Sequence, residues 1–116
     1  MNLYHVMVDL KDDAKALVFA KALDDWLSYL QGQGKIRNWR LMRRKLGLAS
    51  DAHGDFLLEI EVDGLAHLDE AFRHVSSHSD DVERLYEPVH KLIARAEVGV
   101  YRLFPDAERA ERVALL

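Results

Sequence analysis

Three side chains that lie far apart in the sequence could act together on a small molecule. His5, Glu59 and Tyr101 each lie in a short segment in which apolar and polar residues alternate. A histidine exchanges protons near neutral pH, a carboxylate orients it or acts as a base, and a tyrosine hydroxyl donates to a substrate oxygen. If the three segments are neighbouring strands, alternation places these side chains on one face of a sheet. His5 and Tyr101 are therefore the candidate catalytic residues, although a structural polar network between two copies of the chain would use the same residue types.

A basic segment adds a fourth candidate. Residues 35–45 contain six lysines and arginines and no acid, whereas the whole chain has a net charge of −4. If Trp39 and Leu41 face the helices of the fold, Arg40 faces the other way, and its guanidinium could hold a carboxylate, a phosphate or an enolate. The predicted ligand-binding set is therefore His5, Arg40, Glu59 and Tyr101. Two other interpretations of the basic segment are protection of a sheet edge and ion pairing with acids elsewhere in the chain.

The remaining histidines do not predict a metal site. One group follows a helical spacing of three, four and four: His67, Glu70, His74 and His78. Histidines at i and i+4 can share a metal ion, but this flank lies away from the apolar stripe of the same segment, so we interpret it as a solvated helical face. His53 and His90 lie beside residues that form turns or breaks, and we expect them to be exposed polar groups.

The sequence contains no cofactor motif, and we expect no cofactor. The segment Gly32-Gln33-Gly34-Lys35 lacks the earlier glycine and the following Ser or Thr of a phosphate-binding loop, and no dinucleotide fingerprint is present. The absence of cysteine excludes a disulfide and a thiolate site. The net negative charge argues against nucleic acid as a partner, and no apolar run approaches the roughly 20 residues that span a membrane. The N-terminus lacks the features of a secretory signal, so we expect a cytoplasmic location.

Sequence periodicity predicts the elements that would position these residues. Alternation predicts strands at 3–10, 35–46, 55–62 and 96–104, and helical spacing predicts helices at 14–31 and 65–75, the second with a continuation that Asp80 or Asp81 caps and Pro88 breaks. The order is the β-α-β-β-α-β plan of ferredoxin-like α+β domains, with a four-stranded antiparallel sheet and both helices on one face. Residues 1–105 would form a single domain, and the tail at 106–116 has a helical composition.

Three stretches of the sequence resemble a known group of proteins. The segments WRLMRRKLGL, GDFLLEIEV and VYRLFPD look like a bacterial family without an assigned function in the dimeric α+β barrel superfamily. The resemblance covers nearly the whole chain and implies that two ferredoxin-like sheets pack face to face. Relatives in that superfamily include cofactor-free monooxygenases, small-molecule isomerases and stress-responsive proteins, so the fold alone does not select a reaction.

The composition of the second sheet face also predicts pairing. Two helices can cover only one face of a four-stranded sheet, and the other face would carry Met7, Leu57 and Leu103 beside the polar candidates. That face is too apolar to be fully solvated. It therefore favours a homodimer over the alternative, a monomer with an amphipathic surface.

We therefore expect a homodimer that binds a small anionic or aromatic molecule in a cavity between its two sheets. One alternative is a cofactor-independent enzyme of the monooxygenase or isomerase kind, in which His5 shuttles a proton and Tyr101 or Arg40 stabilises an oxyanion. A second alternative is a purely structural or regulatory dimer with a filled interior. An open cavity would favour either of the first two functions, and a packed interior the third.

Overall fold

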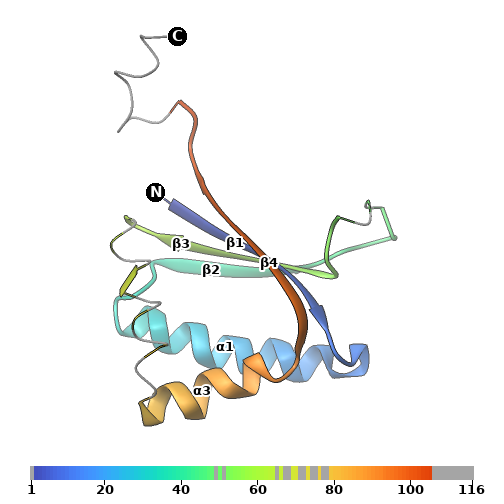
Figure 1. Cartoon of the computed structure of the whole chain (residues 1–116), viewed down its shortest axis with the longest axis horizontal. Coiled ribbons are helices and arrows are strands. Elements are labelled where there is room, and N and C mark those ends of the chain that lie inside the picture. The colour runs from blue at the N-terminus through green and yellow to red at the C-terminus, as the bar shows by residue number, and fades with distance from the viewer. Residues whose placement is uncertain are drawn as a thin grey trace.

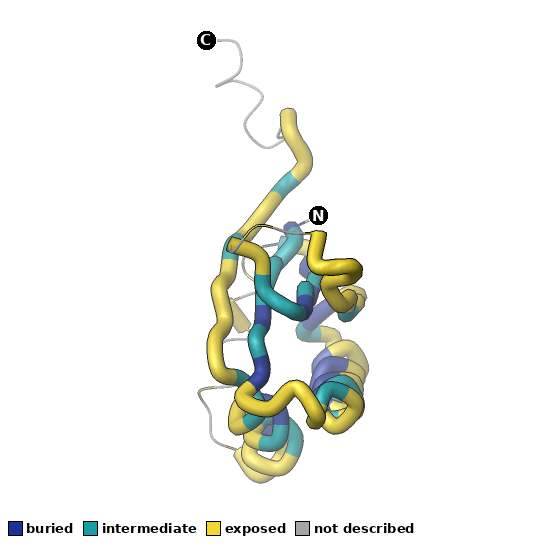
Figure 2. Tube along the Cα trace, turned by 90° about the vertical axis from the view of Figure 1, so that its right-hand side faces the viewer, coloured by how far each residue is buried: buried dark blue, intermediate teal, exposed yellow. Residues whose placement is uncertain are grey.

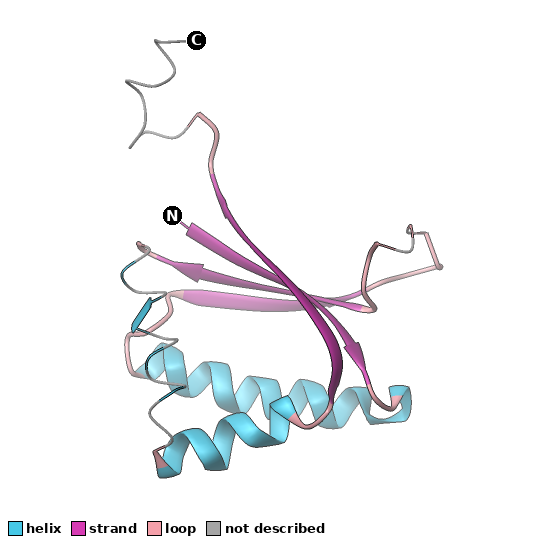
Figure 3. Ribbon diagram, viewed as in Figure 1, coloured by secondary structure: helices cyan, strands magenta, loops and turns pink. Residues whose placement is uncertain are grey.

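Alternating apolar residues build a four-stranded sheet, and the helices α1 and α3 lie against one of its faces (Figures 1 and 3). The computed structural model describes residues 2–48, 50, 52–64, 66, 69–70, 73, 76 and 79–105. Its elements are β1 (Asn2–Leu10), the 3-10 turn η1 (Asp13–Lys15), α1 (Ala16–Gly32), β2 (Asn38–Arg43), β3 (Phe56–Val62), α3 (Asp80–His90) and β4 (Ile93–Arg102).

The sheet has the strand order β2-β3-β1-β4, and every neighbouring pair of strands is antiparallel. Because side chains alternate across a strand, Phe56, Leu58, Ile60 and Val62 of β3 point into the core and are buried. Figure 2 shows the buried residues between the sheet and the helices, whereas most of β4 is exposed. The predicted α+β class, with a four-stranded antiparallel sheet and helices on one face, is confirmed.

Apolar residues at helical spacing hold α1 against the sheet. Asp12 caps the preceding turn, where its carboxylate accepts a hydrogen bond from the backbone N–H of Ala14 at 3.0 Å. Five apolar side chains of α1 are buried: Phe19, Leu23, Trp26, Leu27 and Leu30. The chain leaves the helix at Gly34, whose φ of +72° is a conformation that glycine adopts without steric cost.

The start and end of α3 correct two sequence predictions. Ser79, rather than Asp80 or Asp81, is the N-cap, and its hydroxyl accepts from the backbone N–H of Val82 at 3.4 Å. The two aspartates occupy the first turn, where negative charge stabilises the helix dipole. Pro88 lies inside the helix and does not break it. Since α3 ends at His90, proline removes a hydrogen bond only from the last turn, where the loss is smallest.

Two strands differ from their predicted bounds. β2 is shorter than the predicted strand at 35–46, because Ile36 is buried in the core before the strand begins and Arg44 already belongs to the following loop. β4 begins at Ile93, which pairs with Leu10 across a register shift in β1. Ile93 is half-buried beside the core, so the strand starts earlier than alternation indicated.

Several predictions fall largely or wholly outside the described residues. They are the helix at 65–75, the residues His67, His74 and His78, and the tail at 106–116. Among the helices that the structure does describe, none has the length and apolar composition needed to cross a membrane.

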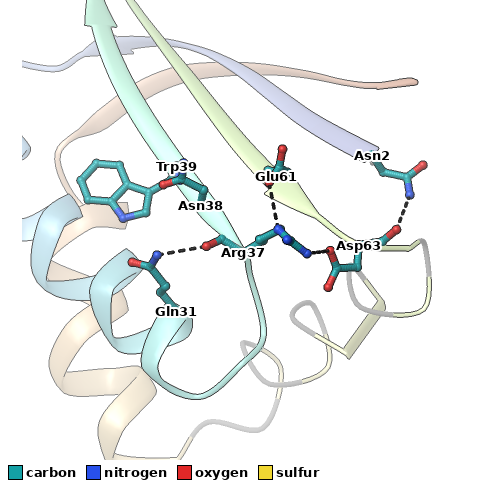
Figure 4. A network of polar contacts seen from close by, with 7 residues as sticks. All are labelled: Asn2, Gln31, Arg37, Asn38, Trp39, Glu61 and Asp63. Carbon is teal, nitrogen blue, oxygen red and sulfur yellow. Dashed lines mark hydrogen bonds and ion pairs between the residues drawn. The ribbon is translucent and has the colours of Figure 1, made fainter. Parts of the chain in front are cut away.

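A polar network fixes the end of the sheet where β1 begins (Figure 4). Arg37 forms ion pairs with Asp63 at 2.8 Å and with Glu61 at 3.6 Å, and its carbonyl accepts from the side-chain amide of Gln31 at 3.0 Å. The pKa of Arg37 is raised by its hydrogen bond to Asp63 and by the charges of both acids. Asn2, only 2% exposed, donates to the carbonyl of Asp63. The network ties the end of α1 to the strands that carry the candidate site.

Candidate functional site

The predicted site residues lie on the sheet face opposite α1 and α3, which we call the open face. Arg40 pairs directly with Glu59 across β2 and β3, and Glu59 pairs with His5 across β3 and β1. His5 in turn lies opposite Gly99 of β4. These residues form a row across all four strands, and the register settles the face of Arg40, which the sequence left open.

Arg40 is already paired within this row. Its Nε donates to a carboxylate oxygen of Glu59 at 2.5 Å, and the side chains are 69% and 14% exposed, respectively. Arg37 and Arg44 likewise pair with acids at the ends of β3, Asp63 and Asp55. The structure thus supports ion pairing as the main role of the basic segment. β2 is also an edge strand, which the second interpretation, protection of a sheet edge, requires. An anion at Arg40 would have to compete with Glu59.

His5 and Tyr101 meet directly on the open face. Their ring centroids are 5.4 Å apart, and the planes are inclined by 72°, an edge-to-face arrangement. A Cβ atom at Gly99 would lie 3.2 Å from Cε2 of Tyr101, so glycine leaves the space in which the tyrosine ring lies. Tyr101 remains exposed in the single chain.

A shallow depression of about 290 Å³ adjoins the row at its β2 end. It is lined by Leu3, Asn38, Trp39, Arg40, Glu59 and Glu61. The open face therefore brings together all four predicted residues, His5, Arg40, Glu59 and Tyr101, but a single copy of the chain leaves them in contact with solvent. A second surface is needed to enclose a ligand there.

A cavity that the sequence did not predict lies on the other face of the sheet, between the strands and the helices. Its volume is about 230 Å³, and its lining comes from β1, β3, β4, α1, α3 and the segment that precedes β2. Among the residues that the structure describes, those of the lining are apolar except for two tyrosines, Tyr4 of β1 and Tyr86 of α3. Alternation and helical spacing identify these residues as core residues. They do not reveal how completely the side chains fill the space between the sheet and the helices. The only sequence signal was a pair of phenols at positions of core periodicity.

The two phenols are shifted toward their protonated forms. Burial raises the pKa of Tyr4, and the neighbouring Tyr86 raises it further. Burial also raises the pKa of Tyr86, with a smaller contribution from the charge of Glu87. Both hydroxyls therefore keep their protons near neutral pH and can donate hydrogen bonds.

Aromatic neighbours orient Tyr86 at the cavity. Its ring centroid lies 5.3 Å from that of Trp26, which also lines the cavity, and 5.6 Å from that of His90. The hydroxyl of Tyr86 is 3.5 Å from Nδ1 of His90. The arrangement suits an apolar or aromatic molecule that accepts one hydrogen bond.

Within the part of the chain that the structure describes, no group of three histidines or carboxylates is placed to hold a metal ion. His53 and His90 are exposed, His53 beside Ser50 and His90 beside Tyr86.

Solved structures share this fold at low sequence identity. A protein of Arabidopsis thaliana matches with a TM-score of 0.70 at 6% identity, over 92% of this chain and 99% of its own. A dimeric ferredoxin-like protein of unknown function from Jannaschia sp. CCS1 matches with a TM-score of 0.63 at 13% identity, over 89% and 100%. A NIPSNAP family protein of Agrobacterium tumefaciens matches with a TM-score of 0.65 at 14% identity, over 90% and 92%. These likenesses confirm the ferredoxin-like fold.

Comparison with curated proteins finds no match. A family model, in contrast, matches the whole sequence, residues 1–116, and its description agrees with the predicted resemblance to a family without an assigned function. The chain belongs to this family, DUF6614, a family of unknown function.

Proposed function

We propose that this protein is a homodimer that binds a small, largely apolar molecule in the cavity between its helices and its sheet. The observation that carries the proposal is the cavity itself, about 230 Å³ of space lined by apolar side chains and by Tyr4 and Tyr86. This location differs from the cavity between two sheets that the sequence predicted.

The pocket is partly open to solvent, so its apolar walls meet water when no ligand is bound. Water is a poor occupant, because a buried water needs two to four polar partners and the lining offers few. A ligand that displaces water from these walls gains the hydrophobic free energy instead.

The lining selects the chemistry of the ligand. Its described residues include no lysine, arginine or histidine, so an anion would lose its hydration without gaining a counter-charge from them. The volume lies below the roughly 300–1,000 Å³ of sites for drug-sized molecules. A single aromatic ring with one hydrogen-bond acceptor fits both limits, with Tyr4 or Tyr86 as the donor. Of the two kinds of ligand expected from the sequence, an aromatic molecule is therefore favoured over an anionic one.

The dimer is proposed on separate grounds. The open face carries Leu3, Met7, Leu57 and Met42 beside its polar row, and α1 and α3 both lie on the other side. Solved structures of the same fold are described as dimeric, among them the Jannaschia protein and one from Thermobifida fusca. Packing two open faces together would remove these apolar side chains from water.

The cavity can be tested with toluene and p-cresol as probes. Trp26 lines the cavity, so saturable changes in its fluorescence are expected in a Trp39→Phe background, which leaves Trp26 as the single tryptophan. Val6→Phe and Ala96→Phe place a ring in the cavity from two different strands and should abolish binding. Val100→Phe is the matched control, because Val100 lies on the same face of β4 outside the cavity lining. If the filled variants fold and still bind both probes as the parent does, the cavity is not the site.

The contact between His5 and Tyr101 favours a second candidate, a site between the open faces of two copies. There a ligand would lie against His5, Arg40, Glu59 and Tyr101, and a cofactor-independent reaction would use His5 to move a proton. Native mass spectrometry of the protein purified from its host tests pairing and a retained ligand together. His5→Ala then separates the alternatives, since it would abolish turnover of an enzyme, weaken a binder, and leave a ligand in the helix-side cavity unaffected.

A further inference from the structure

The tip of the connection between β2 and β3 carries a leucine in a conformation that leucine disfavours. The backbone N–H of Leu48 donates to the carbonyl of Lys45 at 3.2 Å, which closes a turn. The two central residues both have positive φ, +60° at Leu46 and +62° at Gly47. Turns of this kind favour Asn-Gly, because asparagine and glycine tolerate the left-handed region and larger side chains do not.

The side chains of this turn gain little from the rest of the chain. Leu46 is 88% exposed, and Leu48 is nearly as exposed. An apolar side chain that is both strained and fully in water stabilises nothing inside the molecule. Backbone strain of this kind persists where an external contact uses it, so the turn is a candidate contact surface.

The base of the connection is held by contacts within the connection and to β1. The backbone N–H of Arg44 donates to the carbonyl of Asp55 at 2.8 Å, and their side chains form an ion pair at 3.0 Å. The backbone N–H of Asp55 donates to the carboxylate of Asp9 on β1 at 2.9 Å. A Cβ atom at Gly54 would lie 3.1 Å from the backbone nitrogen of Val8, so the connection lies directly against β1. These contacts hold the base of the connection against β1, and we call the turn that carries Leu46 and Leu48 the arm.

The arm rises on the side of the sheet that faces away from the helices, which is the side of the open face (Figure 1). The paired residues Met42 and Leu57 lie on the open face next to its base. At the opposite end of the sheet, β4 continues past the other strands toward Leu103 and Phe104, which are also exposed, on the same side. The open face is thus bordered at each end by a segment that carries exposed apolar residues.

We propose that Leu46 and Leu48 form a dimer arm that packs against Leu103 and Phe104 of a second copy of this chain. The inference rests on the dimer proposed above and adds the contact that completes it. Two-fold pairing of open faces can place arm against arm or arm against the end of β4. The first arrangement would bring Lys45 of both copies together, and like charges repel. The second arrangement packs Leu46 and Leu48 against Leu103 and Phe104. The segment 103–105 carries no charged residue.

Leu46→Asn tests the arm without straining the fold. Asparagine suits the turn better than leucine, so the thermal stability of the separated monomer should stay the same or rise. The dissociation constant of the dimer, measured by sedimentation equilibrium, should increase at least tenfold. Leu17→Asn is the matched control, since Leu17 is 86% exposed on α1, away from the open face, and should leave the dimer unchanged. An unchanged dimer in Leu46→Asn would overturn the arm and leave the dimer standing. A monomeric wild type would overturn both, and neither result touches ligand binding in the helix-side cavity.

Disulfide formation tests where the arm lands. The chain has no cysteine, so Leu48→Cys and Leu103→Cys each introduce a single thiol. A mixture of the two variants should give a covalent dimer on mild oxidation, and Leu48→Cys alone should not. Suppose instead that Leu48→Cys alone gives a covalent dimer, and that adding Leu103→Cys gives no covalent dimer between the two variants. The arms would then lie against each other, and the proposed contact would be overturned.

Discussion

The imidazole of His5 and the phenol ring of Tyr101 meet edge to face, 5.4 Å apart, because Gly99 leaves room between them. His5 and Gly99 are direct partners across β1 and β4, and Tyr101 lies two residues further along the same strand. The tyrosine ring therefore extends over the glycine to reach the histidine. The contact unites the two candidate catalytic residues on the open face.

Gly99→Ala should separate the two rings without harming the fold. The new methyl group would lie 3.2 Å from the Tyr101 ring, which is exposed and free to turn outward. Since glycine is a poor strand residue, stability should change by less than about 1 kcal/mol. The measurement is the NMR shift of the His5 ring protons, which should move toward the value found in Tyr101→Leu. Ring protons that keep their wild-type shift would show that glycine is not what permits the contact.

The sequence predicted the members of this row but not their contacts. Alternation alone placed His5, Glu59 and Tyr101 on one face, because strand parity follows directly from residue spacing. The pairing of Arg40 with Glu59, and of His5 with Gly99, depends on register between strands that are 19 to 94 residues apart along the chain. Register follows from turn geometry and core packing together, which no single segment contains.

Glu59→Gln should increase the affinity of the open face for small carboxylates. Glu59 accepts a charge-assisted hydrogen bond from Arg40, and its removal leaves the guanidinium available to an external anion. Titration with acetate, followed by the NMR signals of Arg40, should show saturable shifts that the wild type lacks. Glu61→Gln is the control, since Glu61 pairs with Arg37 instead. Equal acetate binding by the wild type and Glu59→Gln would mean that the ion pair does not compete with anions.

The same pair should contribute little to stability. Arg40 is largely exposed, and solvent-exposed ion pairs are worth about 0.2–1 kcal/mol. A double-mutant cycle of Arg40→Ala and Glu59→Ala, measured by urea unfolding, should give a coupling free energy in that range. A coupling above about 2 kcal/mol would show that the row is an internal stabilising network and would weaken its assignment as a ligand site.

The helix side of the sheet shows where sequence patterns stop being informative. Periodicity identified the core residues of α1 and β3, but it did not predict a cavity between the helices and the sheet. The volume left unfilled depends on the angle and distance at which α3 approaches the sheet, and those follow from packing. Ser79 and Pro88 illustrate the same limit, because capping and tolerance of proline depend on where the helix begins and ends in three dimensions.

Tyr4→Phe and Tyr86→Phe should separate the polar from the apolar part of ligand binding. If a tyrosine hydroxyl donates to the ligand, one of the two variants should weaken p-cresol binding by roughly 0.5–1.5 kcal/mol, about two- to tenfold, whereas toluene binding should stay unchanged. Calorimetric titration of both probes into each variant gives the comparison. Equal losses for toluene and p-cresol would indicate a packing role instead, and no loss in either variant would exclude the phenols as donors.

Alkaline pH should destabilise the protein through the same two phenols. Burial in the folded state raises the pKa of Tyr4, and likewise that of Tyr86, above the ordinary tyrosine value of about 10. A group whose pKa is raised on folding binds its proton more tightly in the native state, so its contribution is complete below about pH 10 and is lost as pH rises through the folded pKa. Unfolding free energy measured by urea denaturation should therefore be insensitive to these groups at pH 8 and should fall as the pH rises above about 10. The double variant Tyr4→Phe/Tyr86→Phe should show a shallower fall than the wild type, whereas identical slopes would mean that the phenols ionise as freely in the folded protein as in the unfolded chain.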